Sequence, residues 1–344
     1  MTILTGPALV VRGADTVAIE QRSVGSPAPA QVLVQPAHVG LCGTDLEIIS
    51  GDLDPAYVSL PLVLGHEWSG RVAALGDGVD DFTVGDPVVV EGILSCGVCE
   101  ACRSGATNLC MNYDELGFTT DGAVGPGVLV PQHLVHRLSP QVPLEAGALV
   151  EPAAVVLRGL TEVGPRPGER VLVIGDGTVA LLAAMLVRLW SPAHVTIAGR
   201  RDEQDALAAI AGADLFTTTV PDQATFDLVI EAAGSTTAVE TAVQCVRRGG
   251  RLLLLGIAGH GKNAQIPVDD LVNNDITIRG SFSYTAASWA EMVRLLNAGV
   301  VDPLPLVTHR FTIDRFEEAI AVLRAPGGDA RGKVMFLLDE EPDR

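Results

Sequence analysis

The pattern of apolar and polar positions changes near the middle of the chain. In residues 1–150, short apolar runs such as 31–35 and 87–91 are separated by turns that contain glycine or proline, at 76–78 and 85–87. Short runs of β-forming residues bounded by such turns are typical of strands. This part of the sequence therefore predicts a β-rich, partly open barrel.

From Gly168 onward, apolar runs of strand length alternate with longer amphipathic runs. The expected strands are 170–174, 194–198, 226–231 and 251–256, and the expected helices are 178–190, 202–210 and 238–246. This alternation is typical of an α/β fold with a parallel, doubly wound sheet. After residue 284 the pattern returns to amphipathic helices, at 289–298 and 313–323, and ends in a strand at 333–338.

The length and the change of pattern together indicate two domains. A chain of 344 residues exceeds the size at which a single hydrophobic core usually keeps growing. We assign residues 1–150 and 285–344 to one domain, which includes a cysteine-rich lobe at about 95–111. Residues 151–284, with the alternating strands and helices, are assigned to the other domain.

Charge and composition restrict the partners. The formal net charge is −19, and the sequence has two lysines, Lys262 and Lys333, so we expect no nucleic-acid partner. Neither lysine follows a Gly-x-x-x-x-Gly run, which argues against a P-loop. The apolar run 179–190 is too short to span a bilayer, and no basic segment precedes the first apolar residues. We therefore expect a cytoplasmic protein without membrane contact.

The strongest chemical signal is a group of four cysteines within fifteen residues, namely Cys96, Cys99, Cys102 and Cys110. Thiolates spaced by two residues can fold back onto one ion, and four sulfur donors match a closed tetrahedral Zn²⁺ site. Two disulfides are the alternative, but the other cysteines, Cys42 and Cys245, are isolated, which argues against a secreted disulfide framework. Because this site has no residue left over for chemistry, we interpret it as structural.

A glycine-rich turn lies between the first strand and the first helix expected in residues 151–284. It reads Gly175-x-Gly177-Thr178-Val179-Ala180, a Gly-x-Gly-x-x-Ala variant of the dinucleotide-binding fingerprint. The first glycine permits the tight turn, and the second lets the backbone approach a pyrophosphate at the helix N-terminus. A glycine motif alone could be only a turn, but the flanking strand, helix and second strand favour a cofactor site.

The end of the second strand indicates which cofactor binds. An NAD enzyme places an acidic residue there, whereas this strand ends in Gly199, Arg200 and Arg201. Glycine makes room for a 2′-phosphate, and arginine can bind it through two hydrogen bonds. The alternative is a solvated pair of arginines at a helix start. We predict NADP, with NAD as the alternative.

Two glycine-flanked turns each offer a metal ligand. They are Gly40-Leu-Cys42-Gly-Thr44-Asp45 and Gly65-His66-Glu67-Trp-Ser-Gly70. With the four cysteines, the Val150-Glu151-Pro152 segment and the nucleotide fold, they make the chain resemble the zinc-containing medium-chain alcohol/polyol dehydrogenases over essentially its whole length. The resemblance implies a GroES-like catalytic domain beside a Rossmann domain, and a second, catalytic zinc ion.

The resemblance also implies a role for each residue of the second zinc site. Cys42 and His66 would be zinc ligands, and Glu67 would be an alternating or direct ligand. Glu151 would either complete the shell or bond to a water on the metal. Thr44 would relay the proton of the alcohol, and Asp45 would orient His66. The open position of such a site is what distinguishes it from the cysteine-only site.

For the substrate, the resemblance favours a polyhydroxylated molecule such as a sugar, an alditol or a cyclitol. The segment from Glu115 to Ala123 is similar to that of cyclitol and aminocyclitol dehydrogenases. Between Gly117 and Pro131 the acidic–aromatic pair of the family is missing, so no substrate residue is transferred there. Oxidation of threonine or of a simple alcohol is the alternative, and a catalytically silent nucleotide sensor is an alternative of another class.

The run 276–282 lies where relatives join two sheets across a two-fold axis. An open sheet edge of that apolarity would be a liability in a monomer. We therefore expect a homo-oligomer, either a dimer or a tetramer.

Overall fold

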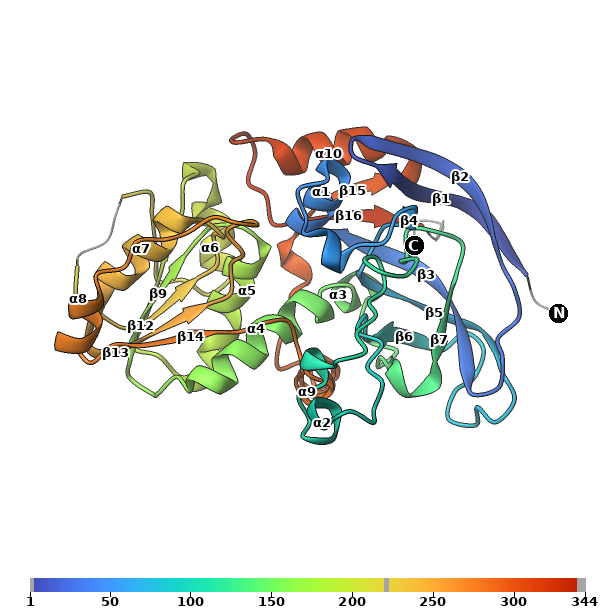
Figure 1. Cartoon of the computed structure of the whole chain (residues 1–344), viewed down its shortest axis with the longest axis horizontal. Helices are drawn as coiled ribbons and strands as arrows, with labels where there is room; N and C mark the ends of the chain where they lie inside the picture. The colour runs from blue at the N-terminus through green and yellow to red at the C-terminus, as the bar shows by residue number, and fades with distance from the viewer. Residues whose placement is uncertain (1–2, 220–222, 339–344) are drawn as a thin grey trace. The chain divides into compact units, whose positions relative to one another are not determined.

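The computed structural model describes residues 3–219 and 223–338, which form two compact units (Figure 1). Unit 1 comprises residues 1–151, 285–325 and 333–344, and unit 2 comprises residues 152–284 and 326–332. Residues 1–2, 220–222 and 339–344 of the predicted domains lie outside the described residues.

Unit 1 is built on two β-sheets. The larger sheet has the order β15-β16-β3-β5-β6-β8, with β7 also paired to β3, and the smaller has the order β2-β1-β4. The strands are β1 (Leu4–Gly13), β2 (Thr16–Val24), β3 (Gln31–Leu41), β4 (Leu62–Val63), β5 (Glu67–Leu75), β6 (Pro87–Val90), β7 (Val128–Pro131), β8 (Val135–Arg137), β15 (Val307–Thr312) and β16 (Lys333–Leu337).

The central strand of this unit, β3, is buried along most of its length, because β16, β5 and β7 pair with it and the core packs on it. Its residues Val32, Val34 and Val39 belong to one apolar cluster that also contains Trp68 of β5 and Phe336 of β16. The helices of the unit are α1 (Gly43–Ser50), α2 (Glu100–Arg103), α3 (Leu144–Gly147), α9 (Ala286–Asn297) and α10 (Phe316–Arg324), and α4 (Val150–Val163) begins at its boundary with unit 2.

Unit 2 is a six-stranded parallel sheet with the order β11-β10-β9-β12-β13-β14. Its order reverses between β9 and β12, as in a doubly wound sheet whose ligands bind at the switch point. The strands are β9 (Arg170–Ile174), β10 (His194–Ala198), β11 (Leu215–Thr217), β12 (Phe226–Glu231), β13 (Val246–Leu254) and β14 (Thr277–Gly280). The helices are α5 (Thr178–Val187), α6 (Asp205–Ile210), α7 (Thr236–Cys245) and α8 (Val268–Asn273).

Three of the predicted strands, 170–174, 194–198 and 226–231, have the observed bounds. The predicted strand 251–256 instead begins at Val246 and ends at Leu254, and Val246 pairs with Phe226 of β12. Residues 247–250 are polar or glycine, so their sequence carries no strand pattern. Val246 and Arg251, on either side of this segment, both pair with β12, and the register of the pairing shifts between them.

The division between the units differs from the predicted domains at two places. Glu151 belongs to unit 1, and residues 326–332 belong to unit 2. Hydrogen bonds within unit 2 explain the second difference: the Thr178 hydroxyl donates to the Gly332 carbonyl at 3.1 Å. The Gln204 side-chain amide also donates to the Arg331 carbonyl and accepts from the Arg331 N–H.

Among the described residues, no helix combines the length and the apolarity that crossing a membrane requires.

Candidate active site and metal centres

Cys42 lies at the junction of β3 and α1. It is the N-cap of α1, and its backbone N–H donates to Asp45 Oδ2 at 2.8 Å. An acid at this helical position is favourable because it satisfies an N–H that the helix leaves unpaired. The Thr44 hydroxyl oxygen lies 3.7 Å from Cys42 Sγ. The start of α1 therefore brings the predicted ligand and the predicted relay hydroxyl together.

His66 immediately precedes β5 and follows Gly65, whose φ is +105°. Its Nδ1 lies 3.5 Å from Oδ1 of Asp45, which is fully buried. That distance is longer than a good hydrogen bond, so the contact is mainly electrostatic. Burial lowers the pKa of His66, but the negative Asp45 and Cys42 beside it outweigh burial and raise the pKa well above its usual value. One carboxylate, that of Asp45, thus contacts both turns, and its role in orienting His66 stays a prediction.

Glu67 forms a buried ion pair with Lys333, the first residue of β16. The Lys333 ammonium donates to Glu67 Oε2 and also to the Leu41 carbonyl at 3.2 Å. Gly40 makes room for the pair, because a Cβ there would lie 2.4 Å from Glu67 Oε2. Lys333 has no role in the site predicted from the sequence. The one feature of the sequence that could have drawn attention to Lys333 is its position at the start of an apolar strand, in a chain with two lysines.

The side chains of Cys42, His66 and Glu67 form a group that could hold a metal ion. One ligand atom from each lies within 4.8 Å of the others. A thiolate, an imidazole and a carboxylate are common ligands of Zn²⁺, and three protein ligands leave the open position of a catalytic site. The donor set therefore fits a catalytic zinc ion. Lys333 occupies Oε2 of Glu67, so Oε1 is the oxygen that remains for a metal.

Glu151 lies in the first turn of α4, and its side chain is buried. It stands outside the group of ligand atoms that are mutually within 4.8 Å. Burial, followed by the charge of Glu67, raises its pKa to about 8, although His66 and Lys333 act in the opposite direction. Glu151 thus lies near enough to interact electrostatically with Glu67 and His66, but it is not one of the three grouped metal-ligand side chains.

Glu115, which has no role in the site predicted from the sequence, lies beside this site in the structure. Glu115 is buried, and burial raises its pKa to about 7, while the charge of His66 lowers it. Its carboxylate accepts a hydrogen bond from the Tyr113 hydroxyl. The Glu115–Gly117 part of the cyclitol-dehydrogenase resemblance was the signal that could have found it.

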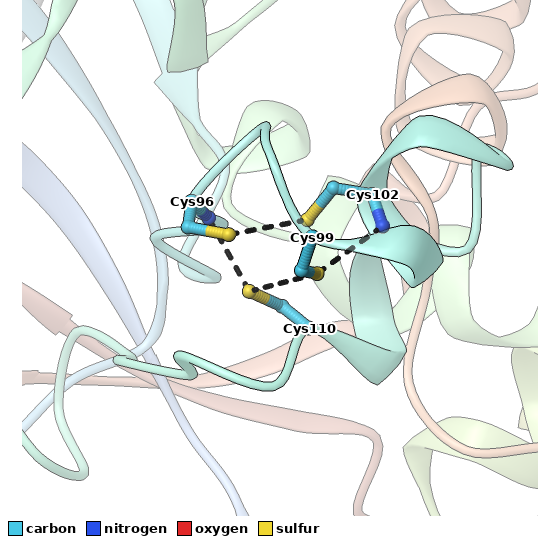
Figure 2. A group of neighbouring side chains, drawn as sticks. All are labelled: Cys96, Cys99, Cys102 and Cys110. Carbon is cyan, nitrogen blue, oxygen red and sulfur yellow. Dashed lines mark hydrogen bonds between the residues drawn. The ribbon is translucent and has the colours of Figure 1, made fainter.

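The four cysteines of the lobe point toward one another from α2 and the loops around it (Figure 2). Cys96 Sγ lies 3.9 Å from Cys102 Sγ, and Cys99 Sγ lies 4.0 Å from Cys110 Sγ. Four sulfurs at 2.3 Å from a tetrahedral zinc ion would lie about 3.8 Å apart, so the set fits the metal. Backbone N–H groups of Val98 and Cys99 lower the pKa of Cys96 to about 6, which favours the thiolate that a metal requires. None of the six cysteines, all of which lie among the described residues, forms a disulfide.

The glycine-rich turn adopts the expected conformation between β9 and α5. Gly175 has φ +124°, and a Cβ there would lie 2.9 Å from the Ala232 carbonyl group. Gly177 is the N-cap of α5, and a Cβ there would meet no atom within 4 Å. Thr178 and Val179 form the first turn of the helix, and the Thr178 hydroxyl is bonded to Gly332. The N-terminus of α5 therefore has open space in which a phosphate could bind.

The two arginines after β10 differ in their surroundings. Arg200 is exposed, whereas Arg201 is buried and its guanidinium forms an ion pair with Asp176, 2.9 Å from Nη2 to Oδ1. Asp176 also explains Gly199, since a Cβ at that position would lie 2.6 Å from the Asp176 Cβ. The structure thus leaves Arg200, rather than both arginines, free to meet an anion.

Comparison with known proteins agrees with this arrangement. Residues 28–140 match the description "Alcohol dehydrogenase GroES-like domain", and residues 178–298 match "Zinc-binding dehydrogenase". The sorbitol dehydrogenase of Bacillus subtilis is 30% identical over 310 residues, which cover 84% of this chain and 85% of that protein. The chain belongs to the zinc-containing medium-chain alcohol/polyol dehydrogenase family.

Two further relatives extend the comparison. An L-threonine 3-dehydrogenase of Saccharopolyspora erythraea is 33% identical over 314 residues, covering 87% of this chain and 90% of that one. The crystal structure of a zinc-binding dehydrogenase from Sinorhizobium meliloti, bound to NADP, superposes with a TM-score of 0.90 at 25% identity, covering 98% and 100% of the two chains. The predicted family and fold class, a GroES-like domain with a Rossmann domain, are confirmed. The protein is a zinc-dependent alcohol/polyol dehydrogenase.

Proposed function

We propose that this dehydrogenase transfers a hydride between NADP(H) and a secondary alcohol or ketone of a polyhydroxylated substrate, with two zinc ions per chain. The observation that carries the proposal is the group of Cys42, His66 and Glu67, with the Thr44 hydroxyl 3.7 Å from Cys42 Sγ. A closed cysteine site and an open three-ligand site in one chain support one structural and one catalytic metal.

Each side chain of the site has a defined task in this proposal. Zinc held by the three ligands would supply a Lewis acid that makes the substrate hydroxyl more acidic. The Thr44 hydroxyl accepts the proton of the alcohol and passes it on. Asp45 keeps Cys42 and His66 in place through its two oxygens. With a pKa of about 8, Glu151 can hold a proton near neutral pH.

The preference for NADP rests on two features of unit 2. Position 199 carries no acid that could accept hydrogen bonds from the ribose 2′-hydroxyl, and Arg200 is exposed beside it. The relative from Sinorhizobium meliloti was crystallised with NADP. Binding of NAD remains the alternative outcome of the test.

The polyhydroxylated substrate is supported by buried carboxylates near the metal site and by the sorbitol dehydrogenase among the relatives. The second candidate is a threonine-type activity, favoured by the 33% identity to an L-threonine 3-dehydrogenase. A buried carboxylate near the metal site can accept a hydrogen bond from a hydroxyl of a polyol or from the ammonium group of threonine, so it suits either substrate class.

We also propose a homo-oligomer, a dimer or tetramer, in the cytoplasm. β14 is the last strand of its sheet, and Val268 and Val272 of the preceding helix are 68% and 73% exposed. An edge strand beside exposed apolar side chains would gain from pairing with a second copy. Six cysteines that form no disulfide in the described part of the chain suit a reducing compartment.

One screen tests the proposal. The purified protein is assayed with sugars, alditols, cyclitols and L-threonine, each with NADP and with NAD, and its zinc is measured by mass spectrometry. We expect about two zinc ions per chain and formation of NADPH with a polyhydroxylated substrate. Turnover of L-threonine alone would contradict the polyhydroxylated substrate, and a preference for NAD would contradict the assignment of NADP. Light scattering at micromolar concentration measures the oligomeric state.

A further inference from the structure

The loop from Tyr113 to Thr120 packs directly on the turn that carries His66. Gly117 has φ +78°, and a Cβ there would lie 3.0 Å from the carbonyl of Gly65 and 3.2 Å from the His66 nitrogen. The ring of Phe118 lies 4.8 Å from the ring of His66. This loop therefore borders the metal site within unit 1.

The backbone of Glu115 is fixed in this loop. Its carbonyl accepts hydrogen bonds from three successive N–H groups, those of residues 118–120. Its own N–H donates to the Thr119 hydroxyl at 2.8 Å, and it forms a β-bridge with Ile93. A side chain held on such a backbone is preorganised for binding.

The carboxylate of Glu115 differs in its surroundings from three other buried carboxylates of unit 1, those of Glu67, Glu91 and Asp45. Glu67 is paired with Lys333, and Glu91 Oε1 lies 2.8 Å from His136 Nε2. Asp45 accepts the Cys42 N–H and faces His66. Glu115 is 7% exposed and, within the described part of the chain, its one hydrogen-bond donor is the Tyr113 hydroxyl and no cation forms an ion pair with it.

The buried carboxylate of Glu151 likewise has no cation paired with it among the described residues. Glu151 is 9% exposed, and among residues 3–219 and 223–338 its carboxylate has no ion-pair or hydrogen-bond partner. Each of the two acids interacts electrostatically with His66, and Glu115 raises the pKa of Glu151. Burying a carboxylate without a partner is unfavourable, so a partner from outside the chain would stabilise this arrangement.

We infer that Glu115, held by Tyr113, is a specificity-determining residue that accepts a hydrogen bond from a donor group on the carbon next to the one oxidised. The donor is a hydroxyl or an ammonium group, so the preferred substrates are vicinal diols or vicinal amino alcohols. The Tyr113 hydroxyl occupies one oxygen of the carboxylate, and the second oxygen is left for the substrate. This inference rests on the proposed function, because it names which alcohols the same site selects.

The test compares three alcohols that differ at one position: butan-2-ol, butane-2,3-diol and 3-aminobutan-2-ol. For the wild-type enzyme we expect kcat/KM for the diol or the amino alcohol to exceed that for butan-2-ol by about ten- to a hundredfold, the value of a hydrogen bond to a charged group. Binding is measured independently of turnover, from the change that each compound causes in the visible spectrum of the cobalt-substituted enzyme.

Two variants identify the residue and the donor. Glu115→Met should remove the selectivity, so that the ratio of kcat/KM for the diol or the amino alcohol to that for butan-2-ol falls to about one. Glu115→Gln keeps an acceptor but loses the charge, so it should retain selectivity for a hydroxyl and lose selectivity for an ammonium. Glu91→Gln is the matched control, a buried acid of unit 1 that already has His136 as its partner, and it should leave the selectivity unchanged.

The outcomes separate this inference from the proposed function. If neither donor-bearing compound is preferred by the wild-type enzyme, in turnover or in binding to the cobalt enzyme, the role of Glu115 is overturned. The same holds if Glu115→Met keeps the full selectivity. Failure of the proposed function has a different signature, since no alcohol in the broader screen would then reduce NADP, whatever its neighbouring group.

Discussion

The Asp176 carboxylate accepts two hydrogen bonds from the Arg201 guanidinium, 2.9 Å from Nη2 to Oδ1 and 3.3 Å from Nε to Oδ2, and the Asp176 carbonyl accepts a third from Nη2 at 2.9 Å. Oδ2 also accepts the backbone N–H groups of Arg200 and Arg201. Burial alone would raise the pKa of Asp176, but these hydrogen bonds together outweigh burial, so the pKa is lowered. The pair therefore shapes the end of β10 and neutralises Arg201, so that Arg200 supplies the free positive charge.

The first prediction concerns this difference between the arginines. Arg200→Ala should weaken NADP binding about tenfold to a hundredfold, because it removes one charge-assisted contact, and should leave NAD binding nearly unchanged. NADPH and NADH fluorescence titrations measure both affinities. Arg201→Ala serves as the comparison, and it should lower thermal stability and weaken both coenzymes alike. An equal loss for NADP and NAD in Arg200→Ala would contradict the assignment.

The second prediction concerns the cysteine lobe. Cys99→Ser should reduce the zinc content from two ions per chain to one and lower the melting temperature, because the binding energy of a structural metal contributes to folding. Metal analysis and differential scanning fluorimetry measure the two quantities. Cys245→Ser is the control, since this buried thiol lies outside both metal groups. Loss of one zinc ion with an unchanged melting temperature would rule out a structural role.

The third prediction tests the relay hydroxyl. Thr44→Val replaces the hydroxyl by a methyl group and should keep both zinc ions, but lower kcat by about 10²–10⁴-fold, the usual contribution of a positioned proton-transfer group. Steady-state kinetics with metal analysis checks this. His66→Ala should instead lose catalytic zinc as well as activity while NADP binding is retained. Near wild-type oxidation by His66→Ala would remove the catalytic zinc site from the mechanism.

The fourth prediction concerns the buried pair of Lys333 and Glu67. Lys333→Met leaves a buried carboxylate without its cation and should lower the free energy of unfolding by about 3–5 kcal/mol. The double variant with Glu67→Gln should recover part of that loss, because the uncompensated charge is gone. Urea denaturation of the four proteins of this cycle gives the coupling energy. Additive effects would show that the two side chains do not interact.

The fifth prediction follows from the pKa of Glu115, about 7 in the folded protein against an ordinary value of 4.5. The folded state then binds a proton that the unfolded state has lost, so this group stabilises below pH 4.5 and its contribution disappears as the pH rises through 7. Between pH 5.5 and 7.5 the free energy of unfolding should fall by about 2 kcal/mol from this group. Glu115→Gln should flatten that part of the profile in urea denaturation, and an unchanged slope would contradict the raised pKa.

Much of the candidate site was predictable because its chemistry is local in sequence. The four cysteines lie within one short segment, and the turns of Cys42 and His66 each carry their ligand between glycines. The glycine-rich turn was equally clear, since a strand and a helix flank it directly. The partners of these residues were not predictable in the same way: Lys333 reaches Glu67 across 266 positions of sequence.

The sequence by itself determined the alternation of elements, the glycine turns and the spacing of the metal ligands, because these depend on residues close to one another along the chain. Only the tertiary structure decided which charges are compensated. Asp176 takes Arg201 away from a cofactor phosphate, Lys333 neutralises Glu67, and Glu115 and Glu151 are left without a cation among the described residues. The physical reason is that burial and pairing depend on distances in space, which strand pairing and packing set and a one-dimensional pattern does not contain.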